Sequence, residues 1–401
     1  MNERRPEVAD VFRTYEKEFF AKWGHVLSPE QRKAFEAIRD CRTAALGGHV
    51  EYVEQCDTCG HLAVSYNSCR NRHCPKCQAM ARAKWLAARE AELLPVPYFH
   101  VVFTLPQHIG ALALQNAREI YGILFRAASE TLLTIAADPK RLGAAIGFLA
   151  VLHTWGRNLH LHPHLHCVVP GGGLSSDGES WVGCRKQSFF LSVKVLGARF
   201  RNVFLRYLRD AFQEGKLRFH GEMASLAKPA AFEALCRRAG SIKWVVHAKA
   251  PFGGPAQVLK YLARYTHRVA ISNSRLISME GGRVTFLWKD YADGSRTKAM
   301  TLDAVEFIRR FLLHVLPSGF VRIRQYGLLA NRARGEKLAQ CRELLGASPD
   351  RTAATPPEQP CEKAAEPIRK LCPVCKTGHM ISIGIAPARQ FAPSSPRPDS
   401  S

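Results

Sequence analysis

Four histidines occupy alternate positions in one short stretch of the chain, NLHLHPHLHCVVPGGG, which covers residues 158–173. They are His160, His162, His164 and His166. Because side chains on a β-strand point alternately to its two faces, this period of two predicts a strand with imidazoles on one face and Leu165 packed behind them. The apolar run and the glycines that follow indicate that the strand continues into a core and ends at a turn.

Two imidazoles on one face of a strand can bind one divalent metal ion. His164 and His166 would lie about 7 Å apart, the two-residue repeat of a strand. Two neutral nitrogen ligands leave most of the coordination sphere open and the charge of the ion intact, which favours activation of a phosphate over structural support. The alternative is an exposed polar strand with incidental histidines. A metallo-hydrolase of the His-x-His-x-Asp-His type is disfavoured, because Cys167 and Val168 stand where the Asp and the second His would be.

The third ligand of such an ion has three candidates. His153 precedes His164 by enough residues for a neighbouring strand or turn to return it to the site. His162 lies on the ligand face but too far along the strand to share the ion comfortably. Gln257 is the third candidate, because it lies one helical turn before a tyrosine described below. We favour His153.

The charge of the chain predicts a polyanionic partner. Lys and Arg total 57 against 34 Asp and Glu, which gives a formal net charge of +23 and a pI near 9.8. Nucleic acid is the first candidate for such a chain, and a merely basic surface is the alternative. The N-terminus lacks an apolar signal segment, and the apolar stretch 142–152 is too short for a bilayer core of roughly 30 Å. We therefore expect a soluble intracellular protein that does not enter a membrane.

Cysteines predict a zinc site near the N-terminus. The chain has 13 cysteines, which in a reducing compartment indicate metal sites rather than disulfides. Two CxxC pairs with ribbon-like spacing predict one closed, structural tetrathiolate zinc site. Its expected ligands are Cys56, Cys59, Cys74 and Cys77. Cys69, His61 and His73 could substitute as ligands, but we expect them to be loop residues near the metal.

Two further features accompany these cysteines. Arg70, Arg72 and Lys76 surround the second CxxC, so we expect this module to touch phosphate. Another CxxC, Cys372 and Cys375, has no obvious partner pair and leaves a second zinc site open.

A helix predicted around residues 255–268 carries two tyrosines. Tyr261 and Tyr265 are four residues apart and therefore lie on the same face, one turn apart. They fall between an apolar stripe and a basic one, which is formed by Lys260, Arg264 and Arg268. Tyrosine commonly occupies such a border for packing reasons alone. Beside a metal site, however, a phenol can attack a phosphodiester and form a phosphotyrosine.

The remaining patterns outline an α+β chain. We expect helices in the first 50 residues, strands at 98–106 and 160–170, a long helix between them, a hairpin turning at Gly281 and Gly282, and a helix at 302–316. The expected units are a helical and zinc-binding unit at 1–95, a catalytic domain at 96–275, a hairpin and helical extension at 276–346, and a flexible tail with a CxxC at 347–401.

In this order the motifs resemble those of HUH (His-hydrophobe-His) transposases of rolling-circle insertion sequences, the insertion-sequence ninety-one family. The resemblance covers about residues 30–345. It is carried by the motifs SCRNRHCPKC, HVVFTLP, HPHLHCVVPGGG, YLARYTHRVAISN, LWKDY and EFIRRFLLHVLPSGFVRIRQYG.

The resemblance implies a central antiparallel sheet with flanking helices, and cleavage of one DNA strand with Mg²⁺ or Mn²⁺ that leaves a 5′-phosphotyrosine. It makes His164 and His166 metal ligands, supports His153 as a third, and makes Tyr261 and Tyr265 the paired nucleophiles. The implied partners are single-stranded DNA at the ends of the element and target DNA, in the bacterial cytoplasm at the nucleoid. The alternatives are a noncatalytic zinc-ribbon DNA-binding protein and a plasmid replication initiator or relaxase of the same class.

Overall fold

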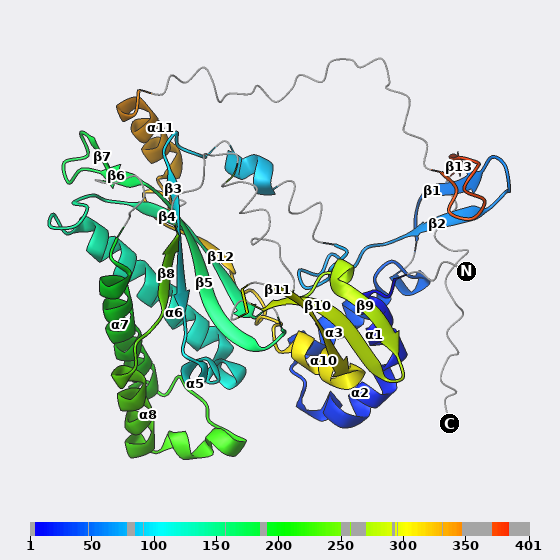
Figure 1. Cartoon of the computed structure of the whole chain (residues 1–401), viewed down its shortest axis with the longest axis horizontal. Coiled ribbons are helices and arrows are strands. Elements are labelled where there is room, and N and C mark those ends of the chain that lie inside the picture. Colours follow the sequence, from blue (N-terminus) through cyan, green and yellow to red (C-terminus); the bar gives the residue numbers. More distant parts are fainter. Residues whose placement is uncertain are drawn as a thin grey trace, which may run out of the picture.

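The computed structural model describes most of the chain. The described residues are 5–46, 48–77, 85–90, 92–156, 158–184, 191–249, 257, 270–290, 293–294, 296–330, 332–346 and 371–384. Figure 1 shows a helix-flanked antiparallel sheet, a second lobe of helices and strands, and a small sheet near the top right of the view. The predicted α+β class with a central antiparallel sheet is confirmed.

The central sheet carries the histidine strand in its middle. Its strand order is β12-β4-β5-β3-β8, and every neighbouring pair is antiparallel. The strands are β3 (Tyr98–Thr104), β4 (Gly147–Trp155), β5 (Leu161–Pro170), β8 (Val246–Lys249) and β12 (Ile323–Gly327). The strands predicted at 98–106 and 160–170 are thus present as β3 and β5.

One face of this sheet is buried under helices. Leu165 and Cys167 of β5 and Phe103 of β3 join the largest apolar cluster, which the helices complete. These helices are α5 (Gln107–Gly110), α6 (Ala113–Ala137), α7 (Val193–Gln213) and α8 (Pro229–Ser241). By length and composition alone α6 could cross a membrane, but 67% of its most apolar window is buried in this core, as is typical of a core helix.

The opposite face carries the histidines at one end and an apolar cover at the other. The cover includes Leu338 and Cys341 of α11 (Arg334–Leu344), which pack with Val151 and Val168 of the sheet. His164 and His166 share this face with Val168, because residues two apart on a strand point the same way. One face of the sheet therefore packs into the largest apolar core, and the other face carries the histidines.

The second lobe joins the N-terminal helices to the hairpin. Phe12 and Phe35 share one core with Phe286, Phe307 and Phe311, so residues from the two predicted units 1–95 and 276–346 pack together. The elements are α1 (Val8–Thr14), α2 (Glu16–Trp23), α3 (Pro29–Asp40), β9 (Leu276–Glu280), β10 (Arg283–Asp290), β11 (Arg296–Asp303) and α10 (Ala304–Leu312). In the rest of the predicted extension, β12 is a strand of the central sheet and α11 packs against that sheet. The predicted boundaries of the units therefore differ from the division of the chain into apolar cores.

Local signals behave as expected in this lobe. Ser28 caps α3 by accepting a hydrogen bond from the backbone N–H of Gln31 at 3.2 Å. Gly281 and Gly282 have φ values of +54° and +76°, as a two-residue hairpin turn with the twist of its strands requires. The predicted turn between β9 and β10 is confirmed.

The small sheet joins strands that lie far apart in the sequence. Its order is β13-β1-β2, with β1 (Gly48–Cys56) in the centre, β2 (Leu62–Tyr66) on one side and β13 (Met380–Gly384) on the other. The remaining described elements are β6 (Gly172–Leu174), β7 (Trp181–Gly183) and the short helices η1 (Gly24–Val26), η2 (Ala44–Leu46), η3 (Gly221–Ala227) and η4 (Asn273–Arg275).

Candidate functional site

Three histidines converge at one end of the central sheet. His153 of β4 lies directly opposite His164 of β5, and His166 follows two residues later on the same face. The ring centroid of His153 is 5.4 Å from that of His164 and 4.5 Å from that of His166. One nitrogen of each ring lies within 4.8 Å of the others, so the three can share one metal ion. The structure thus brings together the three histidines that the sequence favours as ligands.

Hydrogen bonds orient two of these rings. His164 Nδ1 donates to the carbonyl of His162 at 2.6 Å, so Nε2 is the nitrogen of His164 that could bind a metal ion. His166 Nδ1 lies 2.8 Å from Nε2 of His100, a buried histidine on β3. A ring held at one nitrogen presents the other in a defined direction, which is the usual arrangement around a metal-binding histidine.

His100 was not among the residues predicted from the sequence. His100 is the first residue of the motif HVVFTLP, but its position beside His166 depends on the register of the strands. Val102 lies opposite His166, and Thr104 lies opposite His164, so His100 falls on the same face two residues further along. A histidine inside a predicted strand is a signal that it could lie near the other histidines, but only the pairing of β3 with β5 shows that it does.

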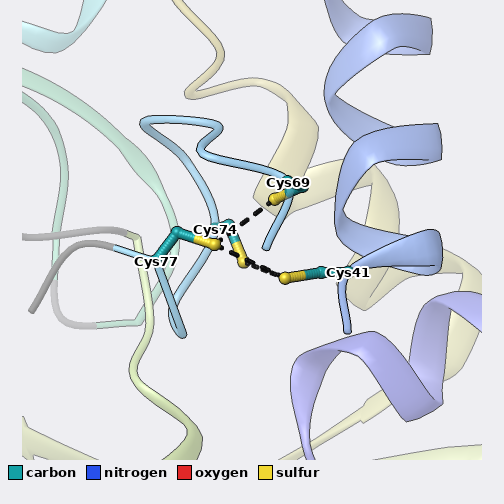
Figure 2. Close-up of side chains that lie close together, drawn as sticks. All are labelled: Cys41, Cys69, Cys74 and Cys77. Carbon is teal, nitrogen blue, oxygen red and sulfur yellow. Dashed lines mark hydrogen bonds between the residues drawn. The ribbon is translucent and has the colours of Figure 1, made fainter. Parts of the chain in front are cut away.

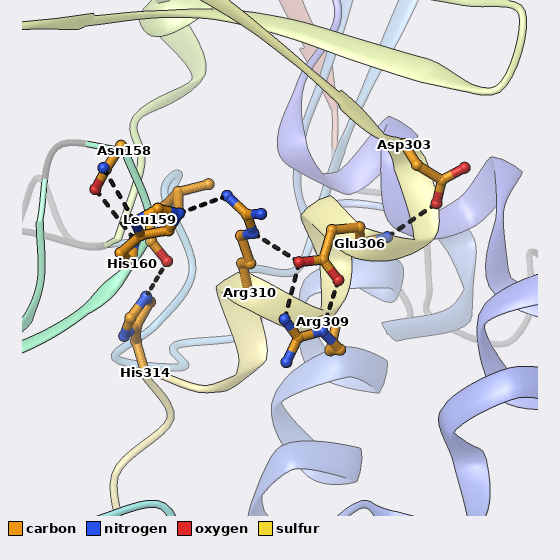
Figure 3. Close-up of polar contacts among 8 residues, drawn as sticks. All are labelled: Asn158, Leu159, His160, Asp303, Glu306, Arg309, Arg310 and His314. Carbon is orange, nitrogen blue, oxygen red and sulfur yellow. Dashed lines mark hydrogen bonds and ion pairs between the residues drawn. The ribbon is translucent and has the colours of Figure 1, made fainter. Parts of the chain in front are cut away.

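The four alternating histidines have different roles. His162 is exposed, and its ring lies 5.1 Å from that of His164. His160 points to the second lobe, where its Nε2 lies 3.0 Å from Nη1 of Arg310 (Figure 3). Of the four alternating histidines, His164 and His166 therefore belong to the histidine group, and His160 contacts α10.

The connection between β4 and β5 is anchored in the second lobe. Leu159 is fully buried in that lobe's core, although its φ of +63° is unfavourable for a residue with a side chain. Its carbonyl accepts a hydrogen bond from Nε2 of His314 at 3.2 Å (Figure 3). Arg310 is held by Glu306, whose pKa is lowered to about 2 by hydrogen bonds from Arg309 and then Arg310. The lobe thus holds the tip of the histidine hairpin.

A first cysteine cluster lies between α3 and the loop that follows β2 (Figure 2). It consists of Cys41, Cys69, Cys74 and Cys77. Cys77 Sγ lies 3.4 Å from that of Cys41 and 3.6 Å from that of Cys69, too far apart for disulfides. The edge of a tetrahedral zinc tetrathiolate is about 3.8 Å for a Zn–S bond of about 2.3 Å, so the four thiols fit a structural zinc ion.

A second cysteine cluster lies on the small sheet and consists of Cys56, Cys59, Cys372 and Cys375. The predicted single site of Cys56, Cys59, Cys74 and Cys77 is therefore wrong in its grouping. The reason is the length of β2, whose five residues span roughly 16 Å and separate the CxxC at the hairpin tip from the one beyond its base. Cys69, expected to be a loop residue, and Cys41, which no sequence pattern marked as a ligand, complete the first cluster instead.

Two basic residues of this region make contacts within the protein. Arg72 donates to the carbonyls of Phe320 at 2.7 Å and Pro317 at 3.0 Å, and Lys76 forms an ion pair with Glu7. The expectation that Arg72 and Lys76 contact phosphate is not supported by these contacts. They fasten the first cysteine cluster to the rest of the protein.

Comparison with known proteins shows the family. A model described as "Transposase zinc-binding domain" matches residues 11–105, and one described as "Putative transposase" matches residues 147–337. A protein of Sinorhizobium fredii, "Putative transposase y4qJ", is 56% identical over 384 residues and covers 95% of each chain. The chain belongs to the insertion-sequence transposase family. "Transposase for insertion sequence element IS801" of Pseudomonas savastanoi pv. phaseolicola is 30% identical over 80% of this transposase and 77% of that protein.

Solved structures resemble this transposase only distantly. The conjugative relaxase TrwC in complex with OriT DNA has a TM-score of 0.24 at 15% identity, over 62% of this chain and 72% of that one. Its metal-bound structure has a TM-score of 0.23 at 16% identity, over 61% and 71% of the chains. The family assignment is carried by the family models and the sequence relatives, and not by these structures.

The predicted nucleophiles of this transposase, Tyr261 and Tyr265, lie outside the described residues. The same holds for the predicted DNA-binding side chains Lys260, Arg264 and Arg268. Gln257 is described as an exposed helical residue. The tyrosines and the basic stripe therefore stay predictions, whereas the histidine group and both cysteine clusters have observed geometry.

Proposed function

We propose that this transposase cuts and rejoins single-stranded DNA at the ends of its insertion sequence, in rolling-circle transposition through 5′-phosphotyrosine intermediates. The observation that carries the proposal is the group of His153, His164 and His166, whose nitrogens lie within 4.8 Å of one another on a rigid sheet. The family of the chain supports it, because the relative named for IS801 is a transposase of an insertion sequence.

The residues present fit a divalent metal ion. His153 and His166 are buried, His164 is half-buried, and the hydrogen bonds described above turn Nε2 of His164 and of His166 away from their Nδ1 partners. When bound, Mg²⁺ or Mn²⁺ would polarise the scissile phosphate, and neutral ligands would leave its charge undiminished for that purpose. The first cysteine cluster, inside the segment matched by the zinc-binding model, would hold a structural Zn²⁺.

The chain supplies the nucleophile in the proposed reaction. The phenolic oxygen of Tyr261 or Tyr265 attacks the phosphorus atom, and the bond from phosphorus to the 3′ oxygen breaks. The phenol loses a proton and the leaving 3′ oxygen gains one, so the products are a 5′-phosphotyrosine and a free 3′-hydroxyl. Attack by another 3′-hydroxyl on the phosphotyrosine reverses these bond changes and joins the strand to a new partner.

Two tyrosines suit strand transfer. One would hold the donor end while the other attacks the target or the second end. If a single tyrosine is essential, we favour Tyr261, because Lys260 and Gln257 are its near neighbours on the helix. The net charge of +23 supports binding of a polyanion, and an unpaired strand can bend to reach a phosphate-cleaving site beside the sheet.

An oligonucleotide-trapping experiment tests the proposal. A single strand with the terminal sequence of the element and a 3′ fluorescent label is incubated with the full chain, with and without Mg²⁺ or Mn²⁺. We expect a labelled protein band on a denaturing gel only with metal. Tyr261→Phe combined with Tyr265→Phe should abolish it, as should His164→Ala. Tyr207→Phe on α7 is the matched control and should keep it.

The outcome separates the proposal from its alternatives. Binding of the oligonucleotide without a covalent adduct, under conditions in which the chain is folded and metal is present, would favour a noncatalytic DNA-binding protein. An adduct that survives the double tyrosine variant would move the nucleophile elsewhere. Loss of the adduct in only one single variant would identify the main nucleophile.

A further inference from the structure

The second cysteine cluster joins segments far apart in the chain. Cys59 Sγ lies 3.7 Å from that of Cys372, although the two residues are 313 positions apart. Cys372 and Cys375 lie beyond both segments matched by the family models, 11–105 and 147–337. We propose that this cluster binds its own structural zinc ion, which fastens the C-terminal segment to the β1–β2 hairpin.

The distances between the sulfur atoms match a zinc tetrathiolate and are too long for a disulfide. Cys56 Sγ lies 3.6 Å from that of Cys375, and all four ligand atoms lie within 4.8 Å of one another. A disulfide requires about 2.05 Å, whereas the edge of a zinc tetrathiolate is about 3.8 Å. Cys56 and Cys372 are buried, so thiols at this spacing would lose solvent without gaining a covalent bond.

The two CxxC segments share one backbone hydrogen bond to sulfur, from the residue two positions after the first cysteine. In the first, the N–H groups of Thr58 and Cys59 each donate to Cys56 Sγ at 3.4 Å. In the second, the N–H of Val374 donates to Cys372 Sγ at 3.4 Å, and that of Gly378 to Cys375 Sγ at 3.3 Å. Hydrogen bonds of this kind favour the thiolate form that binds metal.

The backbone also turns at equivalent positions. The residue after the second cysteine has a left-handed conformation in both segments, with φ +70° at Gly60 and +58° at Lys376. In both segments the N–H of this residue donates to the carbonyl of the first cysteine, at 3.1 Å from Gly60 to Cys56 and at 3.0 Å from Lys376 to Cys372. The two cysteine pairs are therefore held in turns of the same kind, as the two halves of one metal site would be.

The two segments are packed for contact with each other. A Cβ at Gly378 would lie 2.6 Å from Cys56 Sγ and 2.5 Å from Oγ1 of Thr58, so only glycine allows this approach. The N–H of His379 donates to Oδ1 of Asp57 at 2.8 Å, and the N–H of Asp57 donates to the carbonyl of His379 at 3.0 Å. These contacts place both cysteine pairs around one point.

Zinc at this point would complete the small sheet. Strand β13 pairs with β1 from Val53↔Gly384 to Cys56↔Met380, which makes β1 the central strand of three. A two-stranded hairpin is marginally stable alone, and three strands need a stabilising core. Among the residues of this sheet whose burial is described, Cys56, Cys372 and Met380 form an apolar cluster against which Cys375 packs, and a metal ion held by the cysteines would add to its stability.

Zinc content of the full chain tests the inference. We expect two zinc ions per chain by inductively coupled plasma mass spectrometry after removal of loose metal. The double variant Cys372→Ser/Cys375→Ser should contain one, and so should Cys56→Ser/Cys59→Ser. The quadruple variant should also contain one, because both pairs serve the same ion. Cys184→Ser, which changes a partly buried cysteine outside both clusters, should keep two.

A second measurement applies to the wild-type chain and needs no variant to fold. Zinc should protect all four thiols of the second cluster from alkylation, and chelator should release them together, with Cys184 as the reference thiol. Two zinc ions retained in Cys372→Ser/Cys375→Ser would overturn the inference. So would Cys372 and Cys375 that react as fast as Cys184 while zinc is bound. Neither readout depends on DNA cleavage, so the inference can fail or hold independently of the proposed function.

Discussion

His100 and His166 are stacked across the adjacent strands β3 and β5, with ring centroids 5.0 Å apart and planes 9° from parallel. Nε2 of His100 lies 2.8 Å from Nδ1 of His166. For Nε2 of His166 to bind a metal ion, its Nδ1 must carry the hydrogen and donate it to His100. His100 would therefore be a positioning residue that selects the tautomer and the ring direction of a metal ligand.

Replacing His100 by alanine should weaken metal binding without removing a ligand. We expect His100→Ala to raise the metal concentration for half-maximal adduct formation by about 10- to 100-fold, as is typical when the partner of a metal-binding histidine is lost. His100→Gln can still accept the hydrogen bond and should recover part of that loss. His220→Ala, an exposed histidine near η3, is the control. An unchanged metal dependence in His100→Ala would contradict the positioning role.

Leu159 should connect the stability of the second lobe to the histidine site. Leu159→Ala removes a fully buried side chain and should lower the free energy of unfolding by about 2–5 kcal/mol. Because Leu159 anchors the hairpin that carries His153 and His164, adduct formation should fall as well. Thermal unfolding and the trapping assay measure the two effects, with Leu114→Ala, which is 49% exposed, as the control. Equal melting temperatures of Leu159→Ala and wild type would show that Leu159 does not anchor the hairpin.

The buried histidine of the second lobe predicts acid sensitivity. Burial lowers the pKa of His314 to about 4, whereas an unfolded histidine has a pKa of about 6.5. Between these values the unfolded chain binds a proton that the folded chain does not, so stability is present above pH 6.5 and is lost as pH falls toward 4. From pH 7 to pH 5 the loss from this group should be about 2 kcal/mol.

The variant His314→Gln isolates this contribution. It cannot titrate, so its melting temperature should fall less than that of wild type between pH 7 and pH 5. His25→Gln, at an exposed position, should behave as wild type does. An identical pH dependence of wild type and His314→Gln would show that another group dominates the acid response.

The first cysteine cluster makes a prediction that the CxxC pattern alone does not. Cys41→Ser and Cys69→Ser should each cost one zinc ion per chain, because their sulfurs lie 3.4 Å and 3.6 Å from that of Cys77. A site made of Cys56, Cys59, Cys74 and Cys77 would leave zinc unchanged in these variants. Zinc analysis with Cys184→Ser as the control distinguishes the two groupings. Full zinc content in Cys69→Ser would restore the grouping expected from sequence.

Local patterns in the sequence determined much of this protein by themselves. The period of two in the histidine stretch predicted β5, and the two glycines at 281 and 282 predicted the hairpin. Each depends on residues within a few positions of one another, and the local backbone conformation follows from them. The convergence of His153 on His164 was also foreseeable, because a short connection between two strands brings them into register.

Only the tertiary structure decided which distant residues are neighbours. The register of β3 against β5 brings His100 next to His166. The packing of α1–α3 on α10 forms one core from residues of two predicted units, 1–95 and 276–346. The sequence correctly marked Cys56 and Cys372 as members of CxxC pairs, but spacing could not tell which pairs meet. A metal site requires sulfurs about 4 Å apart, and over hundreds of residues that distance is set by the path of the folded chain rather than by position along it.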